Sequence, residues 1–175
     1  TNAFTLEVDL TDLDGLPTSV RDAAREQAKS MGKGDKYIFT LQKPSMLPLL
    51  TYAQNRTLRE QIYKAYLKRG DNGNEYDNNR IVAQMAQLRY RKAQLLGYDS
   101  YAHYVTSNEM AFTPDAVYEL LEGVWTPALE RSQQELERMM SIFRRDHGAD
   151  AKFESWDWWY YAEKVRNTDY SLKEE

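Results

Sequence analysis

The segment SWDWWYYAEKVR, residues 155–166, concentrates three of the four tryptophans of the chain and two tyrosines within six residues. If the segment is helical, Trp156 and Tyr160 lie on one side of it, and Trp158 and Tyr161 lie nearer the other. Rings on both sides cannot all pack into one core face. We therefore expect this helix to lie between two packed layers or to border a cavity, with burial in the core as the commoner fate of such rings.

The rest of the chain is predicted to be mainly helical, because its apolar residues recur at helical spacing. Asn55 can cap one helix, and Thr113-Pro114-Asp115 combines a cap, a first-turn proline and an acid at the positive end of the dipole. Pro127 is expected to kink or break the long helix that follows. The predicted helices cover Val20–Met31, Leu58–Tyr66, Val82–Leu96, a short piece around Ser100–Thr106, Val117–Phe143 and Trp156–Asn167.

Two short stretches are predicted to be extended. Phe4–Val8 and Lys36–Leu41 are rich in aromatic and β-branched residues and are bounded by turn residues. The polar stretch 70–79 is typical of a loop. The predicted fold class is mainly α, a multi-helix array with a small antiparallel pair formed by these two strands.

Composition excludes several classes of partner. A length of 175 residues is enough for a real core. The formal net charge of −4, with basic residues interleaved among acids, predicts no nucleic-acid partner and no anionic membrane surface. No run of 18 apolar residues occurs, and the absence of cysteine rules out disulfides and thiolate metal sites.

No motif for catalysis or metal binding is present. The two histidines, His103 and His147, are not part of an H-E-x-x-H sequence, which would put two zinc ligands one helical turn apart. The acidic loop at Asp71 lacks the glycine and the glutamate that a calcium loop needs. We assign no catalytic residue and no metal-binding residue to these 175 positions.

Five motifs occur in the order found in one known family. They are DLDGLP (12–17), KYIFTLQKPSMLPLLTYAQNRTLRE (36–60), LRYRKAQLLGYDSYAHY (88–104), NEMAFTP (108–114) and WDWWYYAEKVRNTDYSLKEE (156–175). The chain resembles the thimet-oligopeptidase family of zinc metallopeptidases, especially its bacterial peptidyl-dipeptidase and oligopeptidase A branch.

This resemblance implies a large helical enzyme with a deep channel that admits short peptides. It implies zinc held by H-E-x-x-H and a further glutamate, where the metal lowers the pKa of a bound water. In the peptidyl-dipeptidase branch, dipeptides are released from the C-terminus of the substrate. The family's zinc motif lies downstream of the stretch that corresponds to YSLKEE, so none of its catalytic residues can be placed on this chain.

We therefore expect residues 1–175 to be a single helical region excised from a longer peptidase, with zinc bound by the parent protein and not by this segment. Thr1 in place of methionine, and the capping-box pattern Ser171-Leu172-Lys173-Glu174 before the last residue, favour this interpretation. The missing catalytic half would then be a partner of this region. Surface left uncovered by its absence predicts artefactual self-association. A cytoplasmic location is favoured and a periplasmic one stays open.

The aromatic segment is then interpreted as a wedge in the wall of the channel. Its residues predicted to line the substrate channel are Trp156, Asp157, Tyr160 and Tyr161. The alternatives are a helical interaction adaptor or metal-free pseudoenzyme, or a carbohydrate-binding module that uses Trp158 and Trp159 as platforms.

Overall fold

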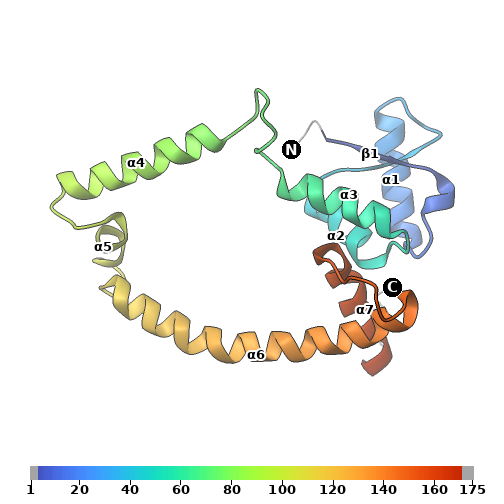
Figure 1. The fold of residues 1–175 in the computed structure, drawn as a ribbon. Helices are drawn as coiled ribbons and strands as arrows, with labels where there is room; N and C mark the ends of the chain where they lie inside the picture. Colours follow the sequence, from blue (N-terminus) through green and yellow to red (C-terminus); the bar gives the residue numbers. More distant parts are fainter. Residues whose placement is uncertain (1–3, 171–175) are drawn as a thin grey trace. The chain divides into compact units, whose positions relative to one another are not determined.

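A computed structural model describes residues 4–170 (Figure 1). In this part of the chain, seven α-helices, two 3-10 helices and two strands follow one another, which confirms the predicted fold class. Their bounds are β1 (Leu6–Val8), η1 (Leu10–Asp12), α1 (Thr18–Ser30), β2 (Tyr37–Phe39), α2 (Lys43–Tyr52), α3 (Arg56–Leu67), α4 (Asn79–Leu95), α5 (Tyr101–Thr106), α6 (Pro114–His147), η2 (Ser155–Asp157) and α7 (Trp158–Tyr170). The capping-box pattern at 171–174 lies outside the described residues.

The chain divides into two compact units. The first contains residues up to 69 together with those from 136 onward, and the second contains residues 70–135. The boundary near residue 135 falls inside α6, so the last part of this helix belongs to the first unit. Each unit is described by itself.

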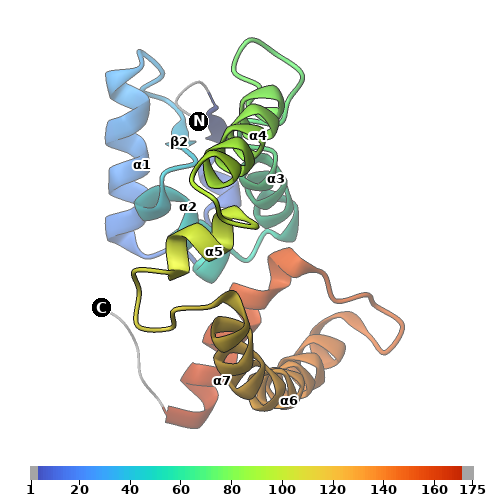
Figure 2. The ribbon, with the colours of Figure 1, turned by 90° about the vertical axis from the view of Figure 1, so that its left-hand side faces the viewer.

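The strands of the first unit pair as predicted. β1 and β2 are antiparallel, with Leu6 opposite Phe39 and Val8 opposite Tyr37. Each strand is shorter than the extended stretch expected from the sequence. The helix α1 packs against β2, and Figure 2 shows the two side by side.

The main core of the first unit joins the strands to α1, α2 and α3. Fully buried members of this core include Leu13, Phe39, Leu49, Leu50 and Ile62. Gly15 is required beside it, because its φ is +87° and a Cβ there would lie 2.3 Å from the carbonyl oxygen of Tyr52. The turn before α1 can therefore approach the end of α2 closely.

The helix α2 was not predicted. It contains two prolines, Pro44 and Pro48. Pro44 lies in the first turn, where a missing N–H costs nothing, whereas Pro48 lies inside the helix. Met46, Leu49 and Leu50 of α2 are buried, so packing outweighs the hydrogen bond that Pro48 cannot donate.

The helix α3 begins as predicted. The side chain of Asn55 accepts hydrogen bonds from the backbone N–H of Thr57 at 3.0 Å and of Leu58 at 3.3 Å. The side-chain nitrogen of Asn55, Nδ2, donates to Asp12 Oδ1 at 2.9 Å. Leu58 and Ile62, both on the predicted apolar face, are buried. The cap therefore also fixes α3 to η1.

The second unit exposes most of its large apolar side chains. Only Ala93 of α4 is buried. Exposed apolar residues recur along α4 and the first part of α6: Ile81, Val82, Met85, Leu88, Leu95, Leu96, Tyr118, Leu120, Leu121, Val124, Trp125 and Leu129. The apolar spacing predicted these helices correctly, but within residues 70–135 no other element of the second unit covers these faces.

Pro127 was expected to kink or break the long helix, and the structure shows no break there. α6 runs without interruption from Pro114 to His147. Pro127 has no N–H to donate to the carbonyl of Gly123, four residues before it. Residues 121–131 are all exposed, so water can bond this carbonyl and the helix continues. Within residues 4–170, no helix combines the length and the apolar content that crossing a membrane requires.

Candidate functional site

The aromatic segment starts with a tight 3-10 turn and not with the α-helix predicted from Trp156. Glu154 and Asp157 form a capping box across η2, in which each side chain accepts a hydrogen bond from the other residue's backbone N–H. The bond from Glu154 N to Asp157 Oδ2 is 3.0 Å long. α7 then continues from Trp158, so the capping box fixes the turn that leads into α7.

Asp157 is the anchor of this segment. Its carboxylate is fully buried and accepts charge-assisted hydrogen bonds from two arginines of α3. Arg56 donates through Nε at 3.0 Å to Oδ1 and through Nη2 at 2.7 Å to Oδ2. Arg59 donates through Nη2 at 2.9 Å to Oδ1. The two arginines lie three residues apart and so project from one side of α3.

Arg59 is itself buried, with 1% of its surface exposed. Its Nη1 donates to the carbonyl of Ala53 at 2.7 Å and to that of Gln54 at 3.2 Å. These carbonyls stand at the end of α2, where the helix dipole is negative. The guanidinium carbon lies 4.2 Å from the centre of the Tyr160 ring. One carboxylate, two carbonyls and a ring face therefore compensate the buried positive charge.

The pKa of Asp157 is lowered despite its position. Burial alone raises the pKa of a carboxyl. Here the hydrogen bonds from Arg56, from the backbone N–H of Glu154 and from Arg59, with the positive charge of Arg56, outweigh burial and hold the pKa below its ordinary value. Asp157 is therefore ionised in the folded protein.

This shift predicts a loss of stability in acid. A carboxyl with a lowered folded-state pKa stabilises the fold above its unfolded pKa of about 3.9, and this stabilisation is lost as the pH falls through the folded-state pKa. We expect the free energy of unfolding to fall more steeply below pH 4 in the wild type than in Asp157→Asn, which cannot titrate. Urea unfolding from pH 6 to pH 2.5 measures both. If the free energy of unfolding falls equally with pH in the two proteins, the pKa of Asp157 is not lowered in the fold.

Around this anchor, the aromatic rings divide between two clusters. Trp156 and Trp159 meet Tyr63 of α3, with ring centres 6.4 Å and 6.0 Å apart, and Trp159 packs on the main core. On the other side, Tyr161 contacts Phe143 at a ring-centre distance of 5.3 Å within a smaller cluster. The helix therefore lies between two packed clusters, as expected, but Tyr160 packs with Tyr161 in the smaller cluster and not on the side of Trp156.

The Tyr161 hydroxyl lies inside the smaller cluster. Only 1% of Tyr161 is exposed, and its hydroxyl donates to Asp146 Oδ2 at 3.3 Å. Burial and the nearby Asp146 carboxylate raise the pKa of Tyr161 far above its ordinary value. Lys164 donates to the same oxygen at 2.5 Å. Tyr161 and Lys164 of α7 are thereby joined to the end of α6.

The four residues predicted to line a channel have two kinds of surroundings. Asp157 and Tyr161 are enclosed by side chains of the same unit. Trp156 and Tyr160 are half-buried. The Trp156 indole nitrogen is buried and has no hydrogen-bond partner among residues 4–170. Whether any of the four faces a substrate stays a prediction.

Sequence reasoning missed Arg56 and Arg59. The only signal was their spacing next to Leu58 and Ile62, which placed two arginines at the edge of an apolar face. Arginines at such an edge usually extend into water. That they converge on one carboxylate about 100 residues away depends on the fold and not on local sequence.

The described residues do not offer a zinc site. No group of three or more histidine, cysteine, aspartate or glutamate side chains within residues 4–170 could hold a metal ion. His103 Nδ1 lies 2.8 Å from Ser100 Oγ at the start of α5. The ring of His147 lies against that of Phe143, tilted by 42°, with centres 4.7 Å apart. Neither histidine stands in a donor set that fits zinc.

Comparison with known proteins identifies the class. The sequence profile of peptidase family M3 matches residues 49–175. Oligopeptidase A from Salmonella typhimurium is 34% identical over 174 residues, which cover 97% of this chain and 25% of that protein. Organellar oligopeptidase A from Arabidopsis thaliana is also 34% identical, over 97% of this chain and 22% of the relative. Dipeptidyl carboxypeptidase from Salmonella typhimurium is 30% identical, over 93% of this chain and 24% of the relative.

The chain therefore belongs to peptidase family M3, as its motifs predicted. It spans about a quarter of the length of these relatives.

Proposed function

We propose that these 175 residues are a scaffold region of a zinc-dependent metallopeptidase that hydrolyses short peptides and releases dipeptides from their C-termini. The observation that carries the proposal is the 34% identity to oligopeptidase A over 97% of the chain. The similarity to dipeptidyl carboxypeptidase supports the dipeptide-releasing activity. The segment has no catalytic role of its own in this proposal.

The proposal places the zinc ligands and the catalytic glutamate of the parent protein outside residues 1–175. Relatives about four times as long as this chain leave room for them. Within the parent, zinc would polarise the scissile carbonyl and lower the pKa of a water.

In this proposal the aromatic segment supports the wall of the substrate channel. Asp157 and Tyr161 would hold the wall in place through Arg56, Arg59 and Asp146. Trp156 and Tyr160 would be the residues that approach the peptide, because each is partly exposed. Half-buried aromatic residues offer an apolar surface to an extended peptide.

The test uses the whole protein encoded by the source gene. We expect it to cleave blocked pentapeptides, to lose activity with 1,10-phenanthroline, and to regain activity when zinc is restored. Mass spectrometry of the products should show a C-terminal dipeptide. Products from internal cleavage alone would overturn the dipeptide-releasing part of the proposal. A protein without chelator-sensitive hydrolysis would favour the adaptor or pseudoenzyme interpretation.

The exposed faces of the second unit predict self-association of the 175-residue chain. In our proposal, the rest of the parent protein covers these apolar residues, and without it they are free to meet each other. We expect the chain to elute above its monomer mass at tens of micromolar and to bind a hydrophobic dye. Size-exclusion chromatography with light scattering measures this directly.

A matched pair of variants localises the effect. Leu121 and Trp125 are exposed one turn apart on α6, so Leu121→Glu with Trp125→Glu should shift the chain towards monomer. Gln133→Glu with Gln134→Glu adds the same charge to the same helix at exposed polar positions and should change little. A monodisperse wild-type monomer without dye binding would contradict the prediction.

A further inference from the structure

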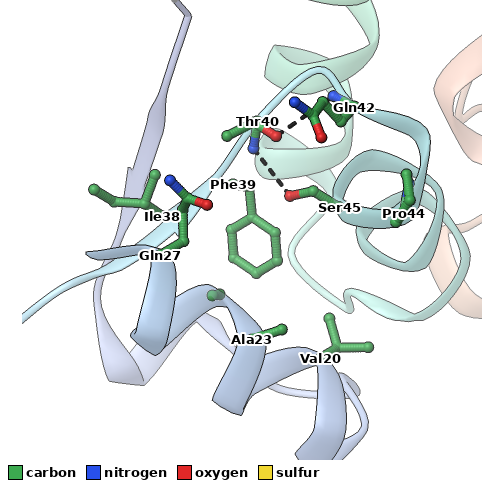
Figure 3. A pocket seen from close by; sticks show the side chains of 10 residues that line it. Val20, Ala23, Gln27, Ile38, Phe39, Thr40, Gln42, Pro44 and Ser45 are labelled. Atoms are coloured by element: carbon green, nitrogen blue, oxygen red, sulfur yellow. Dashed lines mark hydrogen bonds between the residues drawn. The ribbon is translucent and has the colours of Figure 1, made fainter. Parts of the chain in front are cut away.

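A small pocket lies between α1, β2 and the start of α2, far along the chain from the aromatic segment (Figure 3). Its volume is about 170 Å³. Apolar side chains form most of its wall: Val20, Ala23, Ala24, Ile38, Phe39 and Pro44. Figure 3 shows the Phe39 ring between α1 and the start of α2. All of these elements belong to the first unit, so the pocket does not depend on the placement of the second.

The size of the pocket limits what can enter. A cavity of roughly 10–15 Å³ on the same kind of measure holds one water, so this space admits more than a single solvent molecule. Pockets for drug-sized ligands and cofactors run from roughly 300 to 1,000 Å³. The pocket is therefore too small for a nucleotide or an organic cofactor, and its size suits one apolar side chain.

The polar groups of the pocket are few and uncharged. They are Gln27, Thr40, Gln42 and Ser45. Two of them already hold the local backbone, because Thr40 N donates to Ser45 Oγ at 3.0 Å and Gln42 N donates to Thr40 Oγ1 at 3.4 Å. No lysine, arginine, aspartate or glutamate lines the pocket. A charged ligand would lose its hydration here without gaining an opposite charge.

The side-chain amides of Gln27 and Gln42 are the polar groups of the pocket that can still bond a ligand. Both residues are exposed, and within residues 4–170 neither side-chain amide is bonded to another protein group. A primary amide can donate and accept at the same time. The backbone of an extended peptide presents the same two functions, an N–H and a C=O, next to each side chain.

We propose that this pocket binds one leucine- or phenylalanine-sized side chain of an extended peptide, while the Gln27 and Gln42 amides bond the peptide backbone beside it. The site would hold substrate away from the catalytic centre. Only the identity of the peptide as a substrate rests on the proposed function. Binding at the pocket is a separate property and is measured without catalysis.

The experiment titrates the isotope-labelled 175-residue chain, kept monomeric by Leu121→Glu and Trp125→Glu in the second unit, with N-acetyl-leucinamide and follows its amide resonances by NMR. We expect saturable shifts centred on Ile38, Phe39 and Thr40, with a Kd on the order of 1–10 mM for so small a probe. N-acetyl-glycinamide, which has no side chain to bury, should give no saturable shift. The charged probe N-acetyl-aspartamide should also fail.

Variants test whether the probe binds in the pocket or elsewhere on the surface. Ala23 is exposed at the pocket wall, so Ala23→Leu should fill the space without disturbing the core and weaken binding at least about tenfold. Arg25→Leu adds the same side chain to an exposed position of α1 outside the pocket and should leave the Kd unchanged. Gln27→Ala and Gln42→Ala should each weaken binding about fivefold, the effect of one neutral hydrogen bond.

The outcomes are distinct from those of the peptidase test. Equal shifts with the leucine and glycine probes, no saturation, or unchanged binding in Ala23→Leu would overturn the pocket proposal even if the parent protein is an active peptidase. Saturable, leucine-selective binding that Ala23→Leu abolishes would support it even if the parent protein hydrolyses nothing.

Discussion

Asp157→Ala is expected to lower the free energy of unfolding by about 3–5 kcal/mol, the usual cost of removing one partner from a buried ion pair. Asp157 is fully buried and joins two arginines of α3 to η2. Without its carboxylate, the buried Arg59 guanidinium would keep, among residues 4–170, the two carbonyls and the Tyr160 ring as partners. Urea unfolding at pH 7, followed by tryptophan emission, measures the change. Three of the four tryptophans lie in the aromatic segment, so this signal follows the first unit.

The control for Asp157→Ala is an exposed ion pair. Glu26 and Lys29 form an i,i+3 pair on α1 of the same unit, with half or more of each side chain exposed. Glu26→Ala should cost less than about 1 kcal/mol, because water competes for both charges. Similar small effects at Asp157 and at Glu26 would show that the buried cluster does not hold the aromatic segment in place.

Phe143→Ala is expected to cost about 3–5 kcal/mol, the range for truncating a large buried aromatic residue. Phe143 is fully buried, and its ring lies 5.3 Å from the centres of both Phe153 and Tyr161. The guanidinium of Arg56 lies 5.5 Å from the same ring. Its removal would leave a cavity between the end of α6 and α7, and would also withdraw a neighbour of the charged cluster. The urea midpoint with the same tryptophan signal gives the loss.

Tyr170→Ala in the same unit is the matched control for Phe143→Ala. Tyr170 is an aromatic residue of α7 with 66% of its surface exposed. Its truncation should change the free energy of unfolding by no more than about 0.5 kcal/mol. If Phe143→Ala unfolds at the same urea concentration as Tyr170→Ala, the small cluster does not stabilise the junction of α6 and α7.

Most helices and both strands could be predicted from local patterns. Asn55 and Thr113-Pro114 indicated two helix starts by their capping chemistry. In the structure, α3 and α6 begin there. Two of the differences involve proline. Pro48 lies inside α2 because burial of its neighbours outweighs one lost hydrogen bond. Pro127 leaves α6 whole because its surroundings are open to water. Local sequence reports neither burial nor hydration.

The candidate site was predictable only in part. The sequence marked the aromatic segment and predicted two packed sides, and the two clusters around α7 confirm this. It did not indicate that Asp157 is an anchor, because its partners Arg56 and Arg59 lie about 100 residues away. The family could be recognised because its motifs are local and ordered along the chain. The small pocket had no signal, since it depends on how α1, β2 and α2 meet.

The central claim is that this chain is a scaffold region of a zinc peptidase whose catalytic residues lie elsewhere in the same protein. The most direct measurement is the nucleotide sequence of the source gene downstream of the Glu175 codon. Our account predicts an in-frame H-E-x-x-H motif followed by a further glutamate, the donor set of a catalytic zinc site. A stop codon directly after Glu175 would contradict it, and the adaptor or pseudoenzyme interpretation would replace it.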